Sequence, residues 1–420
     1  MKSKFLLLLT TAMFFFGCVG EEIPINPKEP EVPIPNHGNP MNVPEDEIHW
    51  LRPSRTSELR QDLITAYNDY KSRFLRGPFN GNYYVSAGGT FGEGTTFVTQ
   101  SEAHGYGMMI FALATWDKDA KTIFDGMNQI RKANPSTGNP ALMSWVICKS
   151  SESLTSGVPA SARGSSATDG DLDMAYALLL AHKRWEDQSY LSEARTIINA
   201  LKASCVAPQT LRTRLGDWGH WGDPQGLNTR SSDWMPGHFR AFHRATNDDF
   251  WLRAADTVYS LLSQISNPQT GLMPCFLTGI GTDISPDPNC GFAFGEPDGC
   301  VNYSANACRV PWRLATDYIH HEDADAKRQI NRISSWLRNA TSGIPRSIGG
   351  GYTLNGTALR SNGGLHFTAP FAAGMVADET NQQFLNLTWN HIITQRAANS
   401  YGAAIRLLCM LLISGNWAAP

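Results

Sequence analysis

The sequence predicts an all-α fold, a closed double ring built from about six helix hairpins. One observation is a repeated pattern of two segments, each with apolar residues at i, i+3, i+4 and i+7, joined by a short polar turn. The other is that long stretches rich in Gly, Pro and Ser separate these units. An open solenoid is the alternative, but such irregular loops are more typical of a barrel with a cleft at one end.

The first 18 residues are typical of a targeting segment. Lys2 and Lys4 precede the apolar residues 5–17, a stretch too short to cross a bilayer as a helix of the mature protein. It ends at Cys18 in the letters FFGC, which resemble the lipobox of bacterial lipoproteins. An ordinary secretory signal is the alternative. We expect a protein of the bacterial cell envelope, lipid-anchored at the outer membrane and surface-exposed, or otherwise secreted.

Residues 19–45 are predicted to form a stalk. Prolines stand at positions 24, 27, 30, 33, 35, 40 and 44, and such a run favours extended polyproline geometry. The segment is therefore interpreted as a semi-rigid linker that holds the folded domain, residues 46–420, away from a membrane. Apart from the N-terminal segment, nothing in the sequence is apolar enough to cross a bilayer.

Within 46–420 the hairpin pattern recurs in chain order. The clearest copies are residues 181–201 and 241–255, in which an apolar helix, a short polar turn and a second apolar helix follow one another. Fainter copies lie at 111–127 and 312–337. These units, about sixty residues apart, are the elements from which the closed ring is predicted.

Composition excludes several classes of function. The formal net charge is −3, and no run of Lys and Arg with interleaved aromatic residues is present, so nucleic acid is not an expected partner. The sequence has no Gly-rich phosphate loop that opens a helix and no G-x-S-x-G motif, so no cofactor and no metal are predicted. The oligomeric state is not indicated.

Two acidic motifs carry the chemistry. Residues 101–109 read SEAHGYGMM and residues 167–176 read ATDGDLDMAY, and in each a carboxylate precedes a segment that becomes apolar with helical spacing. Both Glu102 and Asp169 are therefore predicted at helix N-termini, where the loops of a helical fold meet its packed end. Two carboxylates presented together are suited to cleavage of a glycosidic bond.

Cysteine usage is consistent with an exported protein. Cys290, Cys300 and Cys308 cluster in a loop-rich stretch, and a disulfide between two of them would hold that loop. The sequence does not indicate which two form the pair. A zinc site is the alternative, but no CxxC pair or nearby His completes four ligands.

These segments resemble glycoside hydrolase family 8. Beyond the two acidic motifs, the matches in order are WMPGHFR at 234–240, NACRVPWR at 306–313 and the closing segment at 407–417. The resemblance covers nearly the whole chain after the stalk. It implies an (α/α)6 barrel and the hydrolysis of β-1,4-linked glycans with inversion at the anomeric carbon.

The resemblance also implies roles for the two acids. Glu102 matches the proton donor, and its charge-poor surroundings would keep it protonated near neutral pH. Asp169 matches the acid that contacts the sugar at the cleavage site. Asp171 and Asp173 are expected to cap the following helix or to form supporting hydrogen bonds.

The base departs from the simplest pattern of the family. Where many members have Asp, this chain has Asn306, which resembles the subgroup that takes its base from an inserted loop. Residues 279–302 form such a loop, and we choose Glu296 within it, with Asp298 as the next candidate. The alternative is that Glu296 is an exposed loop charge and that the protein binds glycan without cutting it.

Aromatic and polar residues near the motifs are expected to bind substrate. Indole and phenol rings pack well on the C–H faces of sugars. The candidates are Tyr106, Trp145, Trp234, Tyr303, Asn306 and Arg309. Arg313 is instead expected to be a buried ion-pair partner. The expected partner is a polysaccharide, a cellulose-like or mixed-linkage β-glucan that is cut within its chain, and chitosan and xylan are the alternatives.

Overall fold

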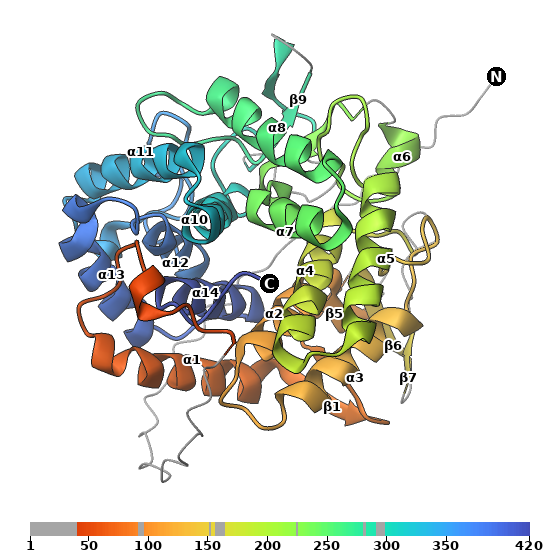
Figure 1. Ribbon diagram of the computed structural model, residues 1–420. Coiled ribbons are helices and arrows are strands. Elements are labelled where there is room, and N and C mark those ends of the chain that lie inside the picture. Colours follow the sequence, from red (N-terminus) through yellow and green to blue (C-terminus); the bar gives the residue numbers. More distant parts are fainter. Residues whose placement is uncertain are drawn as a thin grey trace.

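The computed structural model describes residues 40–90, 96–150, 153–155, 164–223, 226–279, 283–290 and 299–420 of the 420-residue chain. Viewed along its axis, the molecule is a double ring of helices (Figure 1). The inner ring consists of α2 (Ser101–Leu113), α4 (Thr168–Trp185), α7 (Pro236–Thr246), α10 (Val310–His321), α12 (Leu365–Ala373) and α14 (Ser400–Ile413). The outer ring consists of α1 (Leu59–Phe74), α3 (Ala120–Ala133), α5 (Gln188–Ser204), α8 (Phe250–Ile265), α11 (Ala324–Thr341) and α13 (Gln382–Thr394).

The ring is closed by its first and last elements. Each inner helix contacts the next one along the chain, and α14 contacts both α2 and the first outer helix, α1. Every other outer helix packs on the inner helix that precedes it. The all-α fold and the closed ring of hairpins predicted from the sequence are therefore confirmed, and the alternative of an open solenoid is excluded.

Hydrophobic patterning explains which helices lie inside. In α2 every residue except Glu102 is buried, because this helix packs on all sides against other helices. The outer helix α11 is amphipathic, and its buried residues recur every three or four positions from Ala326 to Thr341. The inner helices thus supply the core of the barrel, and the outer helices shield it from water.

The two ends of the barrel differ. The turns that follow α4 and α10 are short: Glu186 and Glu322 end these helices with positive φ angles of 54° and 51°. Asp187 and Asp323 then cap the next helix by accepting backbone N–H groups. We call the end of the barrel that carries these short turns the far end. At the opposite end, the site end, long loops lead into the N-termini of the inner helices.

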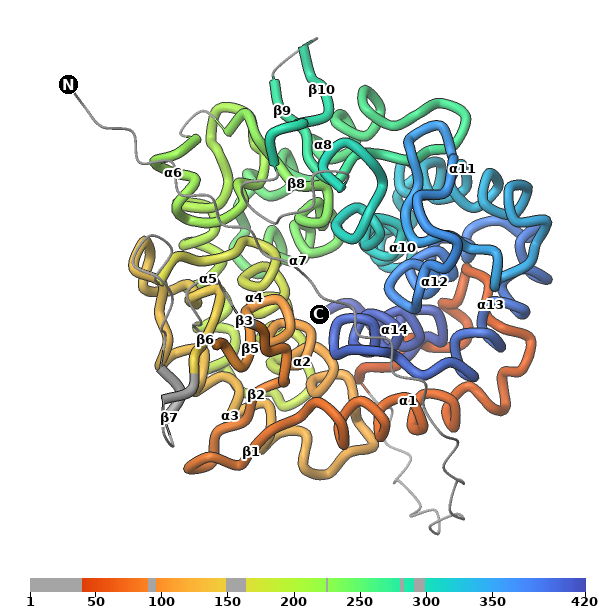
Figure 2. The backbone as a smooth tube through the Cα atoms, turned by 180° about the vertical axis from the view of Figure 1, so that it is seen from behind, coloured from red at the N-terminus to blue at the C-terminus, as the bar shows by residue number. Residues whose placement is uncertain are grey.

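The site-end loops contain short antiparallel strands and single helical turns. The strand pairs are β1 (Leu75–Phe79) with β2 (Asn82–Val85) and β3 (Gly89–Thr90) with β4 (Thr96–Phe97). The three-stranded sheets are β5 (Thr99–Gln100), β6 (Val146–Ser150) and β7 (Ser153–Thr155), and β8 (Thr229–Arg230), β9 (Phe276–Thr278) and β10 (Ser285–Pro286). The short helices include α6 (Gly219–Gly222), η4 (Ser231–Asp233) and η6 (Ala307–Arg309). In Figure 2 the labelled strands lie in two groups, β1, β2, β3, β5 and β6 near α2 and α3, and β8, β9 and β10 near α8. Because β5 runs directly into α2, its pairing with β6 fixes the entry to the first acidic motif.

The predicted signal peptide and most of the predicted stalk lie outside the described residues. Met41, however, is fully buried, and its carbonyl accepts the backbone N–H of Ala418. The folded domain therefore begins before residue 46, because Met41 and Val43 already pack on the barrel. Among the described residues, no helix has the length and apolar character to cross a membrane.

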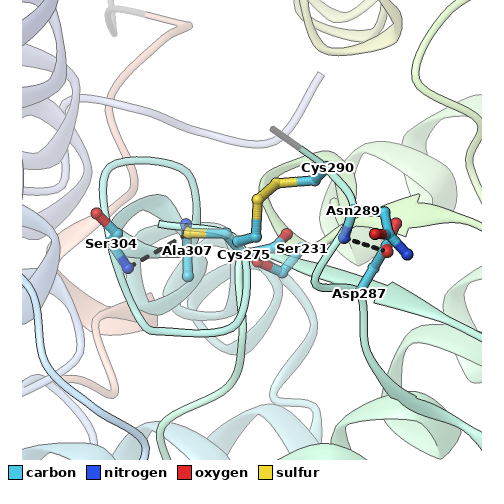
Figure 3. Close-up of a disulfide and its surroundings, with 8 residues drawn as sticks. Ser231, Cys275, Asp287, Asn289, Cys290, Ser304 and Ala307 are labelled. Carbon is cyan, nitrogen blue, oxygen red and sulfur yellow. Dashed lines mark hydrogen bonds between the residues drawn. A yellow bond between two sulfur atoms is a disulfide. The ribbon is translucent and has the colours of Figure 1, made fainter. Parts of the chain in front are cut away.

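The loop-rich stretch after β10 contains a disulfide between Cys290 and Cys300 (Figure 3). The predicted disulfide among the three clustered cysteines is thus confirmed, and Cys308 is the member left as a buried thiol. Beside the disulfide, the sulfur of Cys275 accepts backbone N–H groups of Ser304 and Ala307, each at 3.3 Å. These contacts hold the chain that leads into η6.

Candidate active site

Glycines bring the two acidic motifs together. A Cβ atom on Gly105 of α2 would lie 2.9 Å from the carbonyl oxygen of Gly170. A Cβ on Gly170 of α4 would lie only 2.5 Å from the backbone of Ser101. The first turns of α2 and α4 therefore approach more closely than side chains would allow. This close approach places the side chains of Glu102 and Asp169 next to each other.

Arg309 joins the two carboxylates. Its Nη1 donates to Oε2 of Glu102 at 2.5 Å and to Oδ2 of Asp169 at 2.9 Å. The same nitrogen lies 3.1 Å from the hydroxyl of Tyr106, and Nη2 donates to Oδ1 of Asn306 at 3.0 Å. Four of the residues singled out from the sequence thus converge on one guanidinium group.

A second arginine completes the cluster and was missed by the sequence reasoning. Nη2 of Arg230, at the end of β8, lies 3.0 Å from Oδ1 of Asp169 and 2.9 Å from Oδ1 of Asp233. All three side chains are 5% exposed or less. A signal was present, since Arg230 and Asp233 have opposite charges three positions apart, directly before the recognised segment at 234–240.

The two carboxyl groups have opposite preferences for a proton. Burial raises the pKa of Glu102, the charge of Arg309 opposes this effect and the charge of Asp169 adds to it, and the net result is a pKa of about 7. Burial also acts on Asp169, but Arg230 and Arg309 outweigh it and hold the pKa of this carboxyl well below its usual range. At neutral pH, therefore, Asp169 is ionised while Glu102 retains a substantial protonated fraction. Such a pair has one proton donor beside one fixed negative charge.

The acids that follow Asp169 support the site rather than cap α4. Asp173 accepts two hydrogen bonds from Arg313, at 2.8 and 2.7 Å, and one from His238 at 2.9 Å. Asp171 accepts the backbone N–H of Met143 at 2.9 Å. The expectation of supporting hydrogen bonds and the ion-pair role of Arg313 are confirmed. The alternative of capping is wrong, because Asp171 and Asp173 lie inside α4, and the N-cap position is occupied by Ala167, which makes no side-chain cap.

Burial separates the predicted sugar-binding residues. Trp234 is 1% exposed, and its indole N–H donates to Oγ1 of Thr229 at 3.1 Å. Tyr303 is fully buried and stacks on Phe371, with 5.5 Å between ring centroids. A sugar platform needs an open ring face, and in this structure neither Trp234 nor Tyr303 has one. The ring of Tyr106 is also fully buried, and only its hydroxyl reaches the site.

Trp145 remains a candidate platform. Its side chain is half-buried. Its backbone carbonyl accepts the N–H of Ser101 at 2.8 Å, and its own N–H donates to Ser165 at 2.8 Å. The residue therefore links the chain that enters α2 to the chain that enters α4, beside both acids.

The predicted base lies outside the described residues. Glu296 and Asp298 both fall within 291–298, between the two cysteines of the disulfide, so no geometry is assigned to either carboxylate. Asn306 precedes η6 and accepts a hydrogen bond from Arg309, an orienting contact rather than a proton transfer.

Tyr401 of α14 was also missed by the sequence reasoning. Its ring centroid lies 5.8 Å from the Arg309 guanidinium carbon, and its hydroxyl donates to Ala305 at 2.6 Å.

The sequence of the barrel matches the family model of glycosyl hydrolases family 8 over residues 65–415. The chain belongs to glycosyl hydrolase family 8. It is 35% identical over 395 residues to a β-glucanase of Niallia circulans, with 92% of this chain and 91% of that protein covered. It is 34% identical over 384 residues to an endoglucanase of Bacillus sp. strain KSM-330, with 88% of this chain and 80% of that protein covered.

Solved structures of the family have the same barrel. The apo β-1,3-1,4-glucanase of Paenibacillus sp. X4 superposes with a TM-score of 0.81 at 34% identity, and the match covers 91% of this chain and 100% of that one. A point mutant of Rex8A from Paenibacillus barcinonensis, complexed with xylose, gives a TM-score of 0.65 at 20% identity over 87% of this chain and 94% of that chain, which shows the shared fold alone. This family 8 member is a glycoside hydrolase with an (α/α)6 barrel.

Proposed function

We propose that this enzyme cuts β-1,4 bonds within β-glucan chains, cellulose-like or mixed-linkage, with inversion at the anomeric carbon. The observation that carries the proposal is the buried pair of Glu102 and Asp169, which share Arg309 but differ in their preference for a proton. The identity to proteins named β-glucanase and endoglucanase supports the choice of substrate.

Glu102 acts as the general acid in this proposal. Its pKa of about 7 leaves it protonated below neutral pH, and its side chain is 17% exposed, whereas those of Arg309 and Asp169 are 2% and 3% exposed. It delivers its proton to the oxygen of the leaving sugar. The hydrogen bond that Arg309 donates to Oε2 at 2.5 Å then stabilises the carboxylate that remains.

Asp169 keeps its charge throughout the reaction. Two guanidinium groups hold it in place, so it is positioned to bind a hydroxyl of the sugar at the cleavage site and to stabilise the positive charge that develops on the ring. Inversion also requires a second, ionised carboxylate about 6.5–9.5 Å from the acid to activate water. We assign this role to Glu296, with Asp298 as the alternative, on sequence position alone.

Reducing-sugar release tests the proposal. The full chain is assayed on barley β-glucan, carboxymethyl cellulose, chitosan and xylan under identical conditions. Faster turnover of the two glucans is expected. Faster turnover of chitosan or xylan would contradict β-glucan as the substrate but would still support glycoside hydrolysis. If the protein binds one of the polymers but hydrolyses none of them, the result would contradict hydrolysis and favour a glycan-binding protein.

We further propose that the enzyme is exported and lipid-anchored through Cys18. The FFGC sequence after a short apolar stretch supports this assignment. The test is fractionation of cells that express the parent and the Cys18→Ser variant. The parent is expected in the membrane fraction and the variant outside it. Equal distribution of both proteins would contradict the anchor.

A further inference from the structure

The N-terminal chain joins the barrel at the far end. The backbone N–H of Val43 donates to the carbonyl of Gly415, just beyond α14, at 2.8 Å. The indole N–H of Trp50 donates to the carbonyl of Ile413, the last residue of α14, at 3.0 Å. The backbone N–H of Leu51 donates to Val376, just beyond α12, at 2.8 Å. All three contacts lie at the C-terminal ends of inner helices.

The site lies at the opposite ends of the same helices. Glu102 and Asp169 stand in the first turns of α2 and α4, and Arg309 directly precedes α10. With a rise of 1.5 Å per residue, the 14 residues of α14 span about 21 Å between the two ends. The chain terminus at Pro420 also lies near the centre of the ring in both views (Figures 1 and 2).

We propose that the far end of the barrel faces the membrane and that the anchored enzyme presents its catalytic residues away from the lipid surface. This inference rests on the proposed lipid anchor at Cys18, but it does not depend on the proposed substrate. We base the orientation on the point where the N-terminal chain joins the barrel. This point lies at the far end, so a tether to the membrane pulls that end towards the lipid. A polymer too large to pass beneath the barrel then reaches Glu102 from the solvent side.

The length of chain before the barrel fits this arrangement. Residues 19–39 separate Cys18 from the first described residue, and an extended proline-rich chain rises about 3.1 Å per residue, so these 21 residues reach up to roughly 65 Å. Among the described residues, the exposed large hydrophobic side chains are Trp221, Ile344 and Leu387, and none belongs to a turn of the far end. None of these three side chains therefore gives the far end an apolar anchor of its own, and we assign the orientation to the tether.

Energy transfer to labelled lipid tests the orientation. The lipidated full chain is reconstituted in vesicles that contain an acceptor-labelled lipid, with a donor dye on one introduced cysteine. Lys118→Cys places the dye in the exposed turn after α2 at the far end, and Ser361→Cys places it in the exposed loop before α12 at the site end. The parent labelled in the same way corrects for reaction at native cysteines, and Cys18→Ser provides the unanchored control.

We expect a larger loss of donor emission at Lys118→Cys than at Ser361→Cys, and no loss at either position in the Cys18→Ser background. Deletion of residues 24–35 shortens the tether and is expected to widen the difference, while hydrolysis of soluble polymer stays equal to that of the parent. Equal losses at the two positions, or a larger loss at Ser361→Cys, would overturn the orientation. Because the optical measurement needs no turnover, a failure of the proposed activity would be seen separately.

Discussion

Nη2 of Arg230 lies 3.0 Å from Oδ1 of Asp169, although the two residues are 61 positions apart and come from different units of the barrel. The same nitrogen contacts Asp233, and Arg309 contacts the other oxygen of Asp169. Asp169 is thus a buried carboxylate between two guanidinium groups. This arrangement keeps Asp169 charged at a place where burial alone would neutralise it.

Removal of the proposed acid should abolish turnover without loss of the fold. Glu102→Gln retains the shape of the side chain but cannot deliver a proton, so kcat on β-glucan should fall roughly 100- to 10,000-fold. Circular dichroism and glucan binding should be unchanged. The matched control is Glu322→Gln at the exposed far end, which should behave as the parent does. Activity near the parental level in Glu102→Gln would assign the proton donor elsewhere.

The pH dependence of the parent follows from the protonation of Glu102. A general acid works in its protonated form, so activity is fully present below its pKa and is lost as the pH rises through it. We expect the alkaline limb of kcat/KM close to pH 7. Initial rates on soluble β-glucan at several pH values locate this limb. A limb above pH 9 would be inconsistent with Glu102 as the acid.

Replacement of Arg230 should shift the alkaline limb of the pH profile of kcat/KM. Its positive charge lowers the pKa of Glu102, so Arg230→Gln should shift the alkaline limb of kcat/KM upward, and Arg230→Lys should shift it less. The pH profile separates this effect from a general loss of activity or stability. An Arg230→Gln enzyme whose limb coincides with that of the parent would show that Arg230 has only a structural role.

The loop acids are distinguished by paired substitutions. Glu296→Gln should lower kcat roughly 100-fold or more if Glu296 activates water, whereas Asp298→Asn should have a small effect. The first product seen by NMR should carry the α-anomeric configuration, since inversion of a β-linkage produces it. The opposite ranking of the two variants would transfer the role to Asp298, and a β-configured first product would contradict inversion.

The close approach of α2 and α4 predicts a stability effect. In Gly170→Ala the new methyl group would lie 2.5 Å from the backbone of Ser101, so the helices must separate, at a cost of about 1–3 kcal/mol. The melting temperature and kcat should both fall. Gly222→Ala is the control, since its Cβ would meet only Trp218 at 3.7 Å. Parental stability in Gly170→Ala would show that the crossing tolerates a side chain.

The sequence by itself determined the helix hairpins and the two acidic motifs, because both are local properties. Apolar spacing predicts a helix wherever it occurs, and the hairpins at 181–201 and 241–255 correspond to α4 with α5 and to α7 with α8. The glycines beside Glu102 and Asp169 lie within the same short motifs as the acids whose approach they permit.

Only the tertiary structure decided which side chains surround those acids and which residues are closed to solvent. Arg230 reaches Asp169 through the pairing of β8 with β9 and the placement of η4, contacts that no local pattern encodes. The burial of Trp234 and Tyr303 likewise depends on neighbours distant in the sequence. The protonation of Glu102 is decided in the same way, because a pKa reflects the charges and the solvent that the completed fold places around a group.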